Sequence, residues 1–290
     1  MPRWTSPEAN RHADAVPELP EVETIRRGVE GMVLGRTIAA VTVRDARLRW
    51  PIPPDFAAFA RGKTIHAVAR RGKYLIFDLG GDRLIVHLGM SGRLFVVDTA
   101  VPARKHDHVD FDLADAGGNI LRLRFHDPRR FGAVLPWPAS QAEHPLIQGM
   151  GPEPFGDEFS GEYLFLLSRG RSAPLKNFVM DGRVVVGVGN IYASEALFRA
   201  GLRPQRAAGR VSRAQFEKLA ACILEVLRIA IAAGGTTLRD FANARGESGY
   251  FQQALMVYGR EGEPCTVCGT AVKRLVIGQR SSFFCPQCQR

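Results

Sequence analysis

The sequence predicts an α+β fold, in which an antiparallel β-sandwich that begins with a helix is followed by a helical domain and a small cysteine-rich unit. Three observations predict it. The first half holds short runs rich in Val, Ile, Leu and Phe, punctuated by Gly, Pro and Asp. The second half shows the longer periodicity of helices, and two Cys-x-x-Cys pairs lie near the C-terminus. At 290 residues and 46% hydrophobic, the chain can bury two cores.

The first sixteen residues lack apolar periodicity and the apolar middle of a secretory signal, so we expect residues 1–16 to be a disordered extension. From Glu21 an apolar face recurs at helical spacing, and Gly35 follows the last turn. That face consists of Val22, Ile25, Val29 and Met32. Eight strands are expected around 37–43, 64–68, 74–79, 84–88, 94–97, 109–113, 120–125 and 132–135.

A stretch rich in Pro and Gly, residues 137–154, is expected to link the sandwich domain, 17–136, to the second domain. Helices are expected at 155–170, 174–180, 191–200 and 211–233. The last of them carries Ser212 and Gln215 at capping-box spacing and ends at Gly234. The expected helical domain covers 155–250, and the cysteine-rich unit covers 251–290.

Four cysteines define the C-terminal unit, because Cys265 and Cys268 are separated from Cys285 and Cys288 by sixteen residues. This spacing suits a tetrahedral Zn²⁺ site with two strands between the pairs, which is a zinc ribbon. Two disulfides are the alternative, but a chain with five cysteines and no secretory signal favours one structural Zn²⁺. Cys222 lies in an apolar helical stretch, where we expect an inert buried thiol.

The formal net charge is +10 and the pI is near 9.8, so nucleic acid is the leading partner. Residues 1–16 carry two basic and two acidic side chains, and the excess therefore belongs to the folded part. On charge alone, a merely solvated basic surface stays an open alternative. No apolar run approaches the roughly 20 residues of a membrane span, and we expect a soluble, intracellular protein without membrane contact.

Three carboxylates, Glu18, Glu21 and Glu23, lie at the start of the first helix in the segment Pro17-Glu-Leu-Pro-Glu-Val-Glu-Thr24. Alone, they complement the helix dipole. Together with later motifs, the segment resembles the N-terminus of bacterial formamidopyrimidine-DNA glycosylases, which remove 8-oxoguanine and ring-opened purines from DNA. The resemblance runs from Pro17 to Arg290. The later motifs are RRGKYL (70–75), HLGMSG (87–92), KHDH (105–108), DPRRFG (127–132), GVGNIYA (187–193), GYF (249–251), VYGR (257–260) and the ribbon.

The resemblance implies a bifunctional glycosylase and AP lyase with a helix-two-turn-helix domain. Pro17 matches the family's nucleophile, a secondary amine that attacks the deoxyribose C1′ and forms an iminium, followed by β,δ-elimination. Glu18 matches the acid that protonates the sugar ring oxygen, and Glu21 matches a carboxylate that orders the site. Lys73 matches the lysine that contacts the phosphate at the lesion.

The printed chain departs from the family because Pro17 follows Val16. An internal proline nitrogen is an amide, whose lone pair is delocalised and cannot attack. We predict that Val16 is an alternative start codon whose methionine is removed, so that the active chain begins at Pro17. Met1 and Pro2 would also yield a terminal proline, but Arg3 follows it instead of a glutamate. The intact mass of the native protein tests this prediction.

The resemblance also implies that the enzyme extrudes the damaged nucleotide and fills the gap. Met90, Arg129 and Phe131 match the intercalating residues, with Arg129 facing the orphaned cytosine. Asn190 and Lys176 match phosphate contacts, and the glycines before Asn190 let backbone amides approach an anion. Arg280 matches the finger arginine that grips phosphates beside the lesion.

Two histidines, His106 and His108, are expected as strand-edge or phosphate contacts and not as metal ligands, because four thiolates already complete the zinc site. The resemblance further implies that residues 243–250 form a loop over the extruded base, in which Tyr250 is the residue of interest. The expected partner is double-stranded DNA with oxidised bases. We expect a monomer in the bacterial cytoplasm, associated with the nucleoid.

Two other functions stay open at this point. A sibling enzyme of the endonuclease VIII type prefers oxidised pyrimidines, but its start runs Pro-Glu-Gly-Pro-Glu, whereas Leu19 and the DPRRF motif here favour the purine enzyme. The other is a non-catalytic DNA-binding protein, which is the expected function if Pro17 stays internal.

Overall fold

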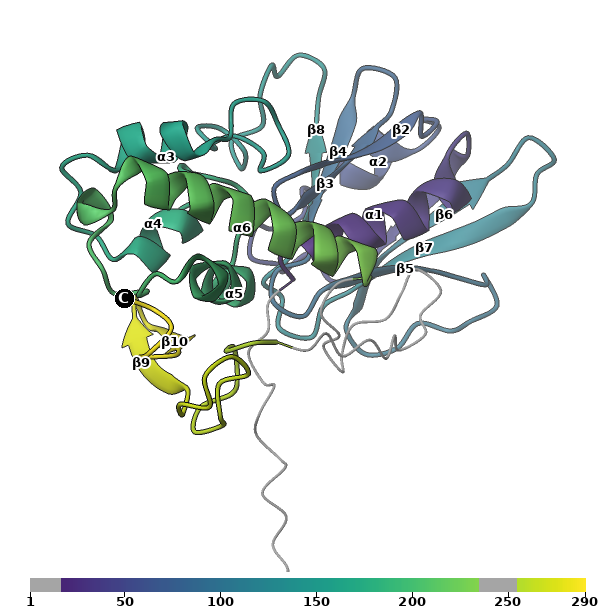
Figure 1. Ribbon diagram of the computed structural model, residues 1–290. Helices are drawn as coiled ribbons and strands as arrows, with labels where there is room; N and C mark the ends of the chain where they lie inside the picture. The colour runs from purple at the N-terminus through teal and green to yellow at the C-terminus, as the bar shows by residue number, and fades with distance from the viewer. Residues whose placement is uncertain (1–16, 235–254) are drawn as a thin grey trace, which may run out of the picture.

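Helix α1 (Leu19–Val33) opens the first domain of the computed structural model, which describes residues 17–234 and 255–290 (Figure 1). Val22, Ile25 and Val29 are buried, as the helical spacing predicts. The helix begins at Leu19, two residues before Glu21, because the Glu21 carboxylate accepts the backbone N–H of Glu18 at 2.9 Å and caps the first turn. Gly35 follows with a φ of +74°, which a glycine adopts without strain.

Two four-stranded antiparallel sheets form the predicted sandwich, in the orders β1-β6-β7-β5 and β2-β3-β4-β8. The apolar side chains that alternate along the strands, such as Leu75 and Phe77, are buried between α1 and the two sheets. The short helix α2 (Phe56–Ala60), which was not expected, adds Phe56 to this core. The strands are β1 (Thr37–Val43), β2 (Ala67–Arg71), β3 (Tyr74–Asp78), β4 (Arg83–His87), β5 (Arg93–Val97), β6 (Asp107–Ala114), β7 (Ile120–His126) and β8 (Ala133–Trp137).

The expected strand at 64–68 was misplaced. Thr64 forms only an isolated bridge with Thr37, whereas β2 begins at Ala67 and continues to Arg71. Pairing with β3 sets the bounds of β2, since Val68 lies opposite Phe77 and Arg71 lies opposite Tyr74. The β2–β3 hairpin therefore turns at Gly72 and Lys73, and this turn reaches the second domain.

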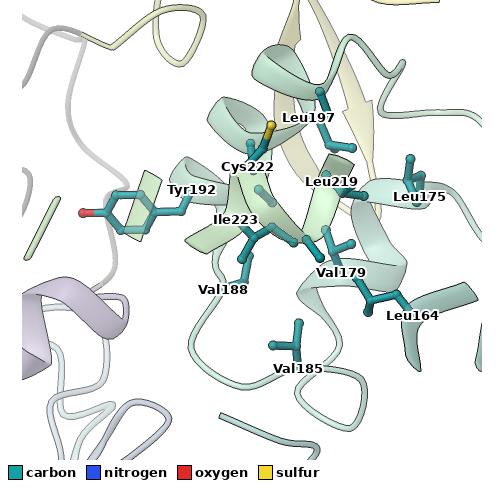
Figure 2. Packing of buried hydrophobic residues seen from close by; sticks show 14 of the residues in the cluster. Leu164, Leu175, Val179, Val185, Val188, Tyr192, Leu197, Leu219, Cys222 and Ile223 are labelled. Atoms are coloured by element: carbon teal, nitrogen blue, oxygen red, sulfur yellow. The ribbon is translucent and has the colours of Figure 1, made fainter. Parts of the chain in front are cut away.

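The second domain packs its helices around one apolar core, shown in part in Figure 2. Cys222 is buried in that core, as expected for an inert thiol. Ser212 and Gln215 form the predicted capping box of the long helix. The expected helix at 155–170 was wrong before Gly161, because the Ser160 side chain accepts the N–H of Tyr163 and begins the helix there. The helices are α3 (Gly161–Ser168), α4 (Leu175–Met180), α5 (Asn190–Ala200) and α6 (Arg213–Ala232).

The C-terminal unit is a hairpin of β9 (Lys273–Ile277) and β10 (Arg280–Phe284), which confirms the two strands expected between the cysteine pairs. It packs against α5, where Phe198 joins Val257 and Phe283 in a small apolar cluster (Figure 1). The helix α6 reaches from the second domain to α1 of the first. Within the described ranges, no helix combines the length and apolar content that crossing a bilayer requires.

Candidate active site

The start of α1 lies against the start of α5, and both Pro17 and Glu18 are buried there. The Glu18 carboxylate accepts the backbone N–H groups of Gly189 and Ile191, each at 2.9 Å, and that of Tyr192 at 3.4 Å. Leu19 adds a backbone bond to the carbonyl of Gly187 at 3.2 Å. The two sides of the site thus come from different domains, and the amides that bind the Glu18 carboxylate lie 171 to 174 residues from it in sequence.

Two glycines make this contact possible. A Cβ on Gly189 would lie 2.2 Å from the Glu18 carboxyl carbon, and one on Gly187 would lie 2.5 Å from the Leu19 side chain. The sequence predicts that these glycines let backbone amides approach an anion. In the structure that anion is the Glu18 carboxylate, which a helix N-terminus stabilises electrostatically.

Glu21 orders this corner of the site. One carboxylate oxygen accepts the hydroxyl of Tyr192 at 2.6 Å, and the other accepts the N–H of Glu18 at 2.9 Å. Figure 2 shows the Tyr192 ring extending its hydroxyl away from the helical core. The bond from Tyr192 connects the two domains across the site.

The protonation of Glu18 depends on its surroundings. Burial raises the pKa of the Glu18 carboxyl above its ordinary value, and the charge of Glu21 raises it further. The charge of Lys73 and the amides of Ile191 and Tyr192 oppose this rise without reversing it. A carboxyl with a raised pKa holds a proton closer to neutral pH and can act as a general acid there.

Two lysines, Lys73 and Lys176, lie near Glu18, and Arg280 of the ribbon lies near both lysines. Lys73 lies in the β2–β3 turn, where burial lowers the pKa of its ammonium and the charge of Glu18 opposes that effect. The exposed Arg280 begins β10, and its charge lowers the pKa of both Lys73 and Lys176. The sandwich and the helical domain therefore each place a lysine near the Glu18 carboxyl, and the ribbon places Arg280 near both lysines.

Lys176 differs from its sequence-based expectation as a phosphate contact. Its side chain is only 1% exposed, and its ammonium donates to the carbonyl of Ser281 at 3.0 Å and to the hydroxyl of Ser282 at 2.8 Å. The Lys176 side chain is buried because α4 packs against the β9–β10 hairpin. In this structure Lys176 holds the hairpin that presents Arg280 and does not reach the surface.

We predict a pH dependence of stability from Lys176. Burial lowers its pKa to about 7, while a lysine in the unfolded chain titrates near about 10.4. Between these values the unfolded chain binds more protons, so the contribution of Lys176 to the free energy of unfolding rises with pH. Urea unfolding of the protein and its Lys176→Met variant at several pH values from 7 to 9.5 should show a growing difference in favour of lysine. A difference that stays constant across this range contradicts the prediction.

The turns that carry Met90 and Phe131 are joined at Asp127. The Asp127 carboxylate accepts the Ser91 hydroxyl at 2.7 Å and the Gly132 N–H at 2.8 Å. A Cβ on Gly89 would lie 2.4 Å from the backbone of Phe131, so the two turns are in contact. Phe131 is 41% exposed, and the Arg129 guanidinium lies 5.2 Å from its ring centroid. The structure thus brings Met90, Arg129 and Phe131 together, whereas Asp127 was missed as the residue that joins them.

The two histidines have different environments. His108 is 3% exposed, and its Nε2 lies 2.8 Å from the carbonyl of Asp127, so it supports the Phe131 turn from inside the protein. Of the two expectations, a strand-edge position or a phosphate contact, the place of His108 at the start of β6 agrees with the first, and its burial does not favour the second. His106 is partly exposed and has a φ of +76°. It remains available as a surface contact at the end of the β5–β6 connection.

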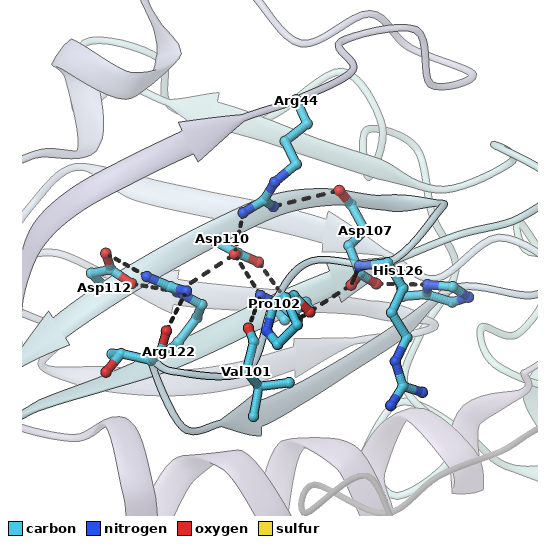
Figure 3. Close-up of polar contacts among 11 residues, drawn as sticks. Arg44, Val101, Pro102, Asp107, Asp110, Asp112, Arg122 and His126 are labelled. Atoms are coloured by element: carbon cyan, nitrogen blue, oxygen red, sulfur yellow. Dashed lines mark hydrogen bonds and ion pairs between the residues drawn. The ribbon is translucent and has the colours of Figure 1, made fainter.

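An ionic network holds that connection in place (Figure 3). The Arg124 guanidinium donates to both carboxylate oxygens of Asp110, at 2.8 and 2.9 Å, and to the carbonyls of Val101 and Pro102. Asp107 pairs with His126 at 2.8 Å on the same face of the sheet. Buried charges of this kind are tolerated because each is paired and hydrogen-bonded. The network fixes the loop that leads to His106.

The four cysteines of the ribbon form a closed metal site. Their sulfur atoms all lie within 4.8 Å of one another, with Cys265 and Cys288 at 3.9 Å and Cys268 and Cys285 at 3.5 Å. A tetrahedron with Zn–S bonds of about 2.3 Å has S···S edges of about 3.8 Å. The spacing fits zinc and confirms the expected site, since all five cysteines are free thiols.

Asn190 is the first residue of α5, and its side-chain amide donates a long 3.4 Å bond to the Tyr258 hydroxyl. Glu195, on the same helix, accepts the backbone N–H groups of residues 256, 257 and 258 at 2.9 to 3.0 Å. Glu195 therefore ties the entry of the ribbon to α5, a role without a sequence signal. Tyr250 and residues 243–250 lie outside the described residues.

Three family models match the chain. The formamidopyrimidine-DNA glycosylase N-terminal domain matches residues 16–134, the H2TH domain of the same family matches residues 150–242, and a zinc finger found in FPG and IleRS matches residues 262–290. Together they cover both domains and the ribbon.

Similar proteins agree with these matches. A formamidopyrimidine-DNA glycosylase of Hahella chejuensis is 55% identical over 275 residues, which are 95% of this chain and 100% of that protein. The MutM (Fpg) crystal structure from Thermus thermophilus is 39% identical with a TM-score of 0.82, and covers 94% of this chain and 98% of its own. A Lactococcus lactis Fpg variant in complex with Fapy-dG DNA is 33% identical with a TM-score of 0.85, over 94% of this chain and 100% of its own. The chain belongs to the formamidopyrimidine-DNA glycosylase family.

Proposed function

We propose that this protein removes oxidised purines from duplex DNA and then cleaves the strand at the resulting abasic site. The carrying observation is the meeting of the two domains at Glu18, which follows Pro17. The amides of Gly189 and Ile191 hold the Glu18 carboxylate, Lys73 adds positive charge from the sandwich, and Arg280 of the ribbon lies near Lys73. A carboxyl whose pKa burial raises, next to a free secondary amine at Pro17 and near Lys73, suits attack on a sugar flanked by phosphates.

The chemistry assigned to these residues is covalent. The free amine of Pro17 attacks the deoxyribose C1′, and the bond from C1′ to the base breaks as the base departs with its electron pair. The departing base takes up the proton that the Pro17 nitrogen releases, which restores the nitrogen lone pair. Glu18 donates a proton to the ring oxygen, so the sugar opens and the nitrogen lone pair forms an iminium with C1′. The iminium acidifies the neighbouring C2′ proton. Loss of that proton expels the 3′-phosphate. Loss of a C4′ proton from the resulting conjugated iminium then expels the 5′-phosphate, which completes the β,δ-elimination.

The residues around Asp127 supply access to the sugar. A base inside a duplex is unreachable, and extrusion costs a few kcal/mol of lost stacking and pairing. Exposed Phe131 and the adjacent Met90 offer apolar bulk to fill the gap, and Arg129 offers donors to the base left opposite. The bonds from Asp127 hold the turns together before DNA binds, which reduces the ordering required on binding.

A single chain holds every residue assigned to this site, and we therefore propose that the protein acts as a monomer on duplex DNA. A four-thiolate zinc site without disulfides suits a reducing compartment. Together with a DNA substrate, this supports the bacterial cytoplasm near the nucleoid as the place of action. Light scattering of the purified protein with and without a lesion duplex tests the monomer.

Borohydride trapping tests the proposed function. The protein with a free Pro17 nitrogen is incubated with duplexes that contain 8-oxoguanine opposite cytosine, an oxidised pyrimidine, or only normal bases. We expect a covalent adduct at Pro17 with 8-oxoguanine and none with normal DNA. An adduct formed only with the oxidised pyrimidine would favour the endonuclease VIII type of activity. Binding to all lesions without any adduct would favour a non-catalytic protein.

Arg280 should contribute one phosphate contact. We expect Arg280→Ala to weaken lesion-DNA binding and to reduce the slope of log K against log salt by about 0.9, because about one counterion per contact is released from B-DNA. Binding titrations between about 50 and about 200 mM salt measure the slope. Arg213→Ala is the control. Arg213 is the first residue of α6 and pairs with Glu162 of α3. An unchanged slope for Arg280→Ala removes Arg280 from the phosphate contacts.

A further inference from the structure

Glu23 is the acidic residue of the Pro17-to-Thr24 segment that has no place in the proposed chemistry. Its side chain is largely buried and collects three arginines. It accepts bonds from Arg27 at 2.7 Å, from Arg26 at 3.0 and 3.1 Å, and from Arg70 at 3.2 Å. Arg26 and Arg27 belong to the same helix, but Arg70 comes from β2, 47 residues away. A capping role at the helix start does not require this long-range pair.

Arg70 connects Glu23 to the linker between the domains. Its Nε donates to Glu23, and its Nη1 donates to Glu153 at 2.7 Å and to the carbonyl of Gly72 at 2.9 Å. Arg70 is 11% exposed at its side chain, so water screens these pairs only in part. One guanidinium thus bridges a carboxylate of α1 and a carboxylate of the linker.

Glu153 also holds the turn of the β2–β3 hairpin. Its second carboxylate oxygen accepts the backbone N–H of Gly72 at 2.6 Å and a bond from Arg71 at 3.3 Å. Arg71 donates in turn to the linker carbonyls of Gly151, at 2.6 Å, and Met150, at 3.2 Å. Five hydrogen bonds from 2.6 to 3.3 Å therefore join residues 70–72 to residues 150–153.

The opposite side of the turn is equally confined. Gly72 has a φ of +56°, and a Cβ there would lie 3.1 Å from the Cβ of Val186, in the segment that leads into α5. The turn is thus held between the linker and the segment whose amides bind Glu18. Lys73 is the next residue, and its position relative to Glu18 follows from the position of this turn.

We infer that Glu23, Arg70 and Glu153 form a latch that fixes the Gly72–Lys73 turn against the second domain, and that Glu23 and Glu153 are positioning residues for Lys73. The inference rests on the proposed function, in which Lys73 contacts the phosphate at the lesion. Misplacement of a reacting or orienting group by about 1 Å can lower a rate about 10²-fold. Loss of the Glu153 carboxylate removes its bonds to Arg70, Arg71 and the backbone N–H of Gly72, so the turn loses part of its anchor on the linker.

Glu153→Gln tests the latch, because the amide keeps the shape of the side chain and removes its charge. We expect the single-turnover rate of 8-oxoguanine excision to fall at least about tenfold, the size seen when supporting residues of a site are removed. Glu143→Gln, an exposed acidic residue of the same linker, is the matched control and should keep the rate of the unaltered protein. Melting temperature and zinc content are measured for every variant.

The decisive comparison uses Lys73→Gln, alone and combined with Glu153→Gln, in time courses long enough to follow slow excision. If the latch acts through Lys73, Glu153→Gln has no further effect once Lys73 is replaced. A second loss of similar size in the double variant, or no loss in the single variant, overturns the inference. If Lys73→Gln itself keeps the full rate, the proposed role of Lys73 fails and the latch fails with it.

If Glu153→Gln does not fold, a second variant tests the latch. Glu153→Asp keeps the charge but is one methylene shorter, and cannot reach both Gly72 and Arg70. It should fold and show the same loss, again only when Lys73 is present. A protein with unaltered residues that forms no adduct with any lesion contradicts the proposed function instead, which separates the two failures.

Discussion

A chain with a free Pro17 nitrogen will form a borohydride-trapped adduct with 8-oxoguanine DNA, whereas the same chain with residues 1–16 attached will form none. The reason is electronic. In the attached form the Pro17 nitrogen is an amide whose lone pair is delocalised into the carbonyl of Val16. A free α-amino group titrates near about 7.7–8 and is partly unprotonated at neutral pH. Loss of a nucleophile lowers kcat by about 10⁶-fold in a well-studied covalent enzyme, and we expect an effect of that order.

Two preparations of defined intact mass measure this effect, one beginning at Pro17 and one beginning at Pro2 after removal of Met1. Both should unfold with similar cooperativity and hold one zinc, so that a difference in chemistry cannot reflect a loss of folding. Peptide mapping of any adduct distinguishes Pro17 from Pro2. Cleavage at full rate by the longer form, with its mass verified after the reaction, contradicts the proposed attack.

Replacement of one zinc ligand should have the second large effect. We expect Cys268→Ser to lower the zinc content from one to nearly none and to unfold the β9–β10 hairpin. Structural zinc contributes about 10–16 kcal/mol of apparent binding free energy in small metal-folded units. The hairpin carries Arg280 and the two serines that hold Lys176, so lesion binding should fall with the metal. Atomic absorption and binding titrations on the same samples measure both losses.

Cys222→Ser is the matched control for this experiment. Cys222 is buried in the helical core, so its replacement by serine should lower stability modestly and leave both zinc and DNA binding intact. A zinc content of one in Cys268→Ser, with the hairpin unaltered, would contradict the four-thiolate site. Loss of zinc with unchanged lesion binding would instead separate the ribbon from DNA recognition.

Much of the fold was readable from local patterns. Helical spacing in α1, the capping box of α6 and the paired Cys-x-x-Cys motifs each depend on residues close in sequence, and each is confirmed. The sandwich followed from short apolar runs broken by turn residues, and its two sheets are confirmed. Errors arose where long-range pairing decides the outcome, as for β2, whose register with β3 overrides the apolar run at 64–68. The assignment of Pro17, Glu18 and Lys73 came from resemblance and remains a proposal.

The sequence by itself determined most of the helices and strands, the metal ligands and the family, because these depend on residue type, spacing and motif order. Only the tertiary structure decided which charges meet. It placed the Glu18 carboxylate on the α5 amides, buried Lys176 beneath the ribbon and joined Glu23 to Glu153 through Arg70. Periodicity indicates whether a side chain is buried but does not identify its partner, because a buried charge is satisfied by groups that are distant in sequence and close only after the domains have packed.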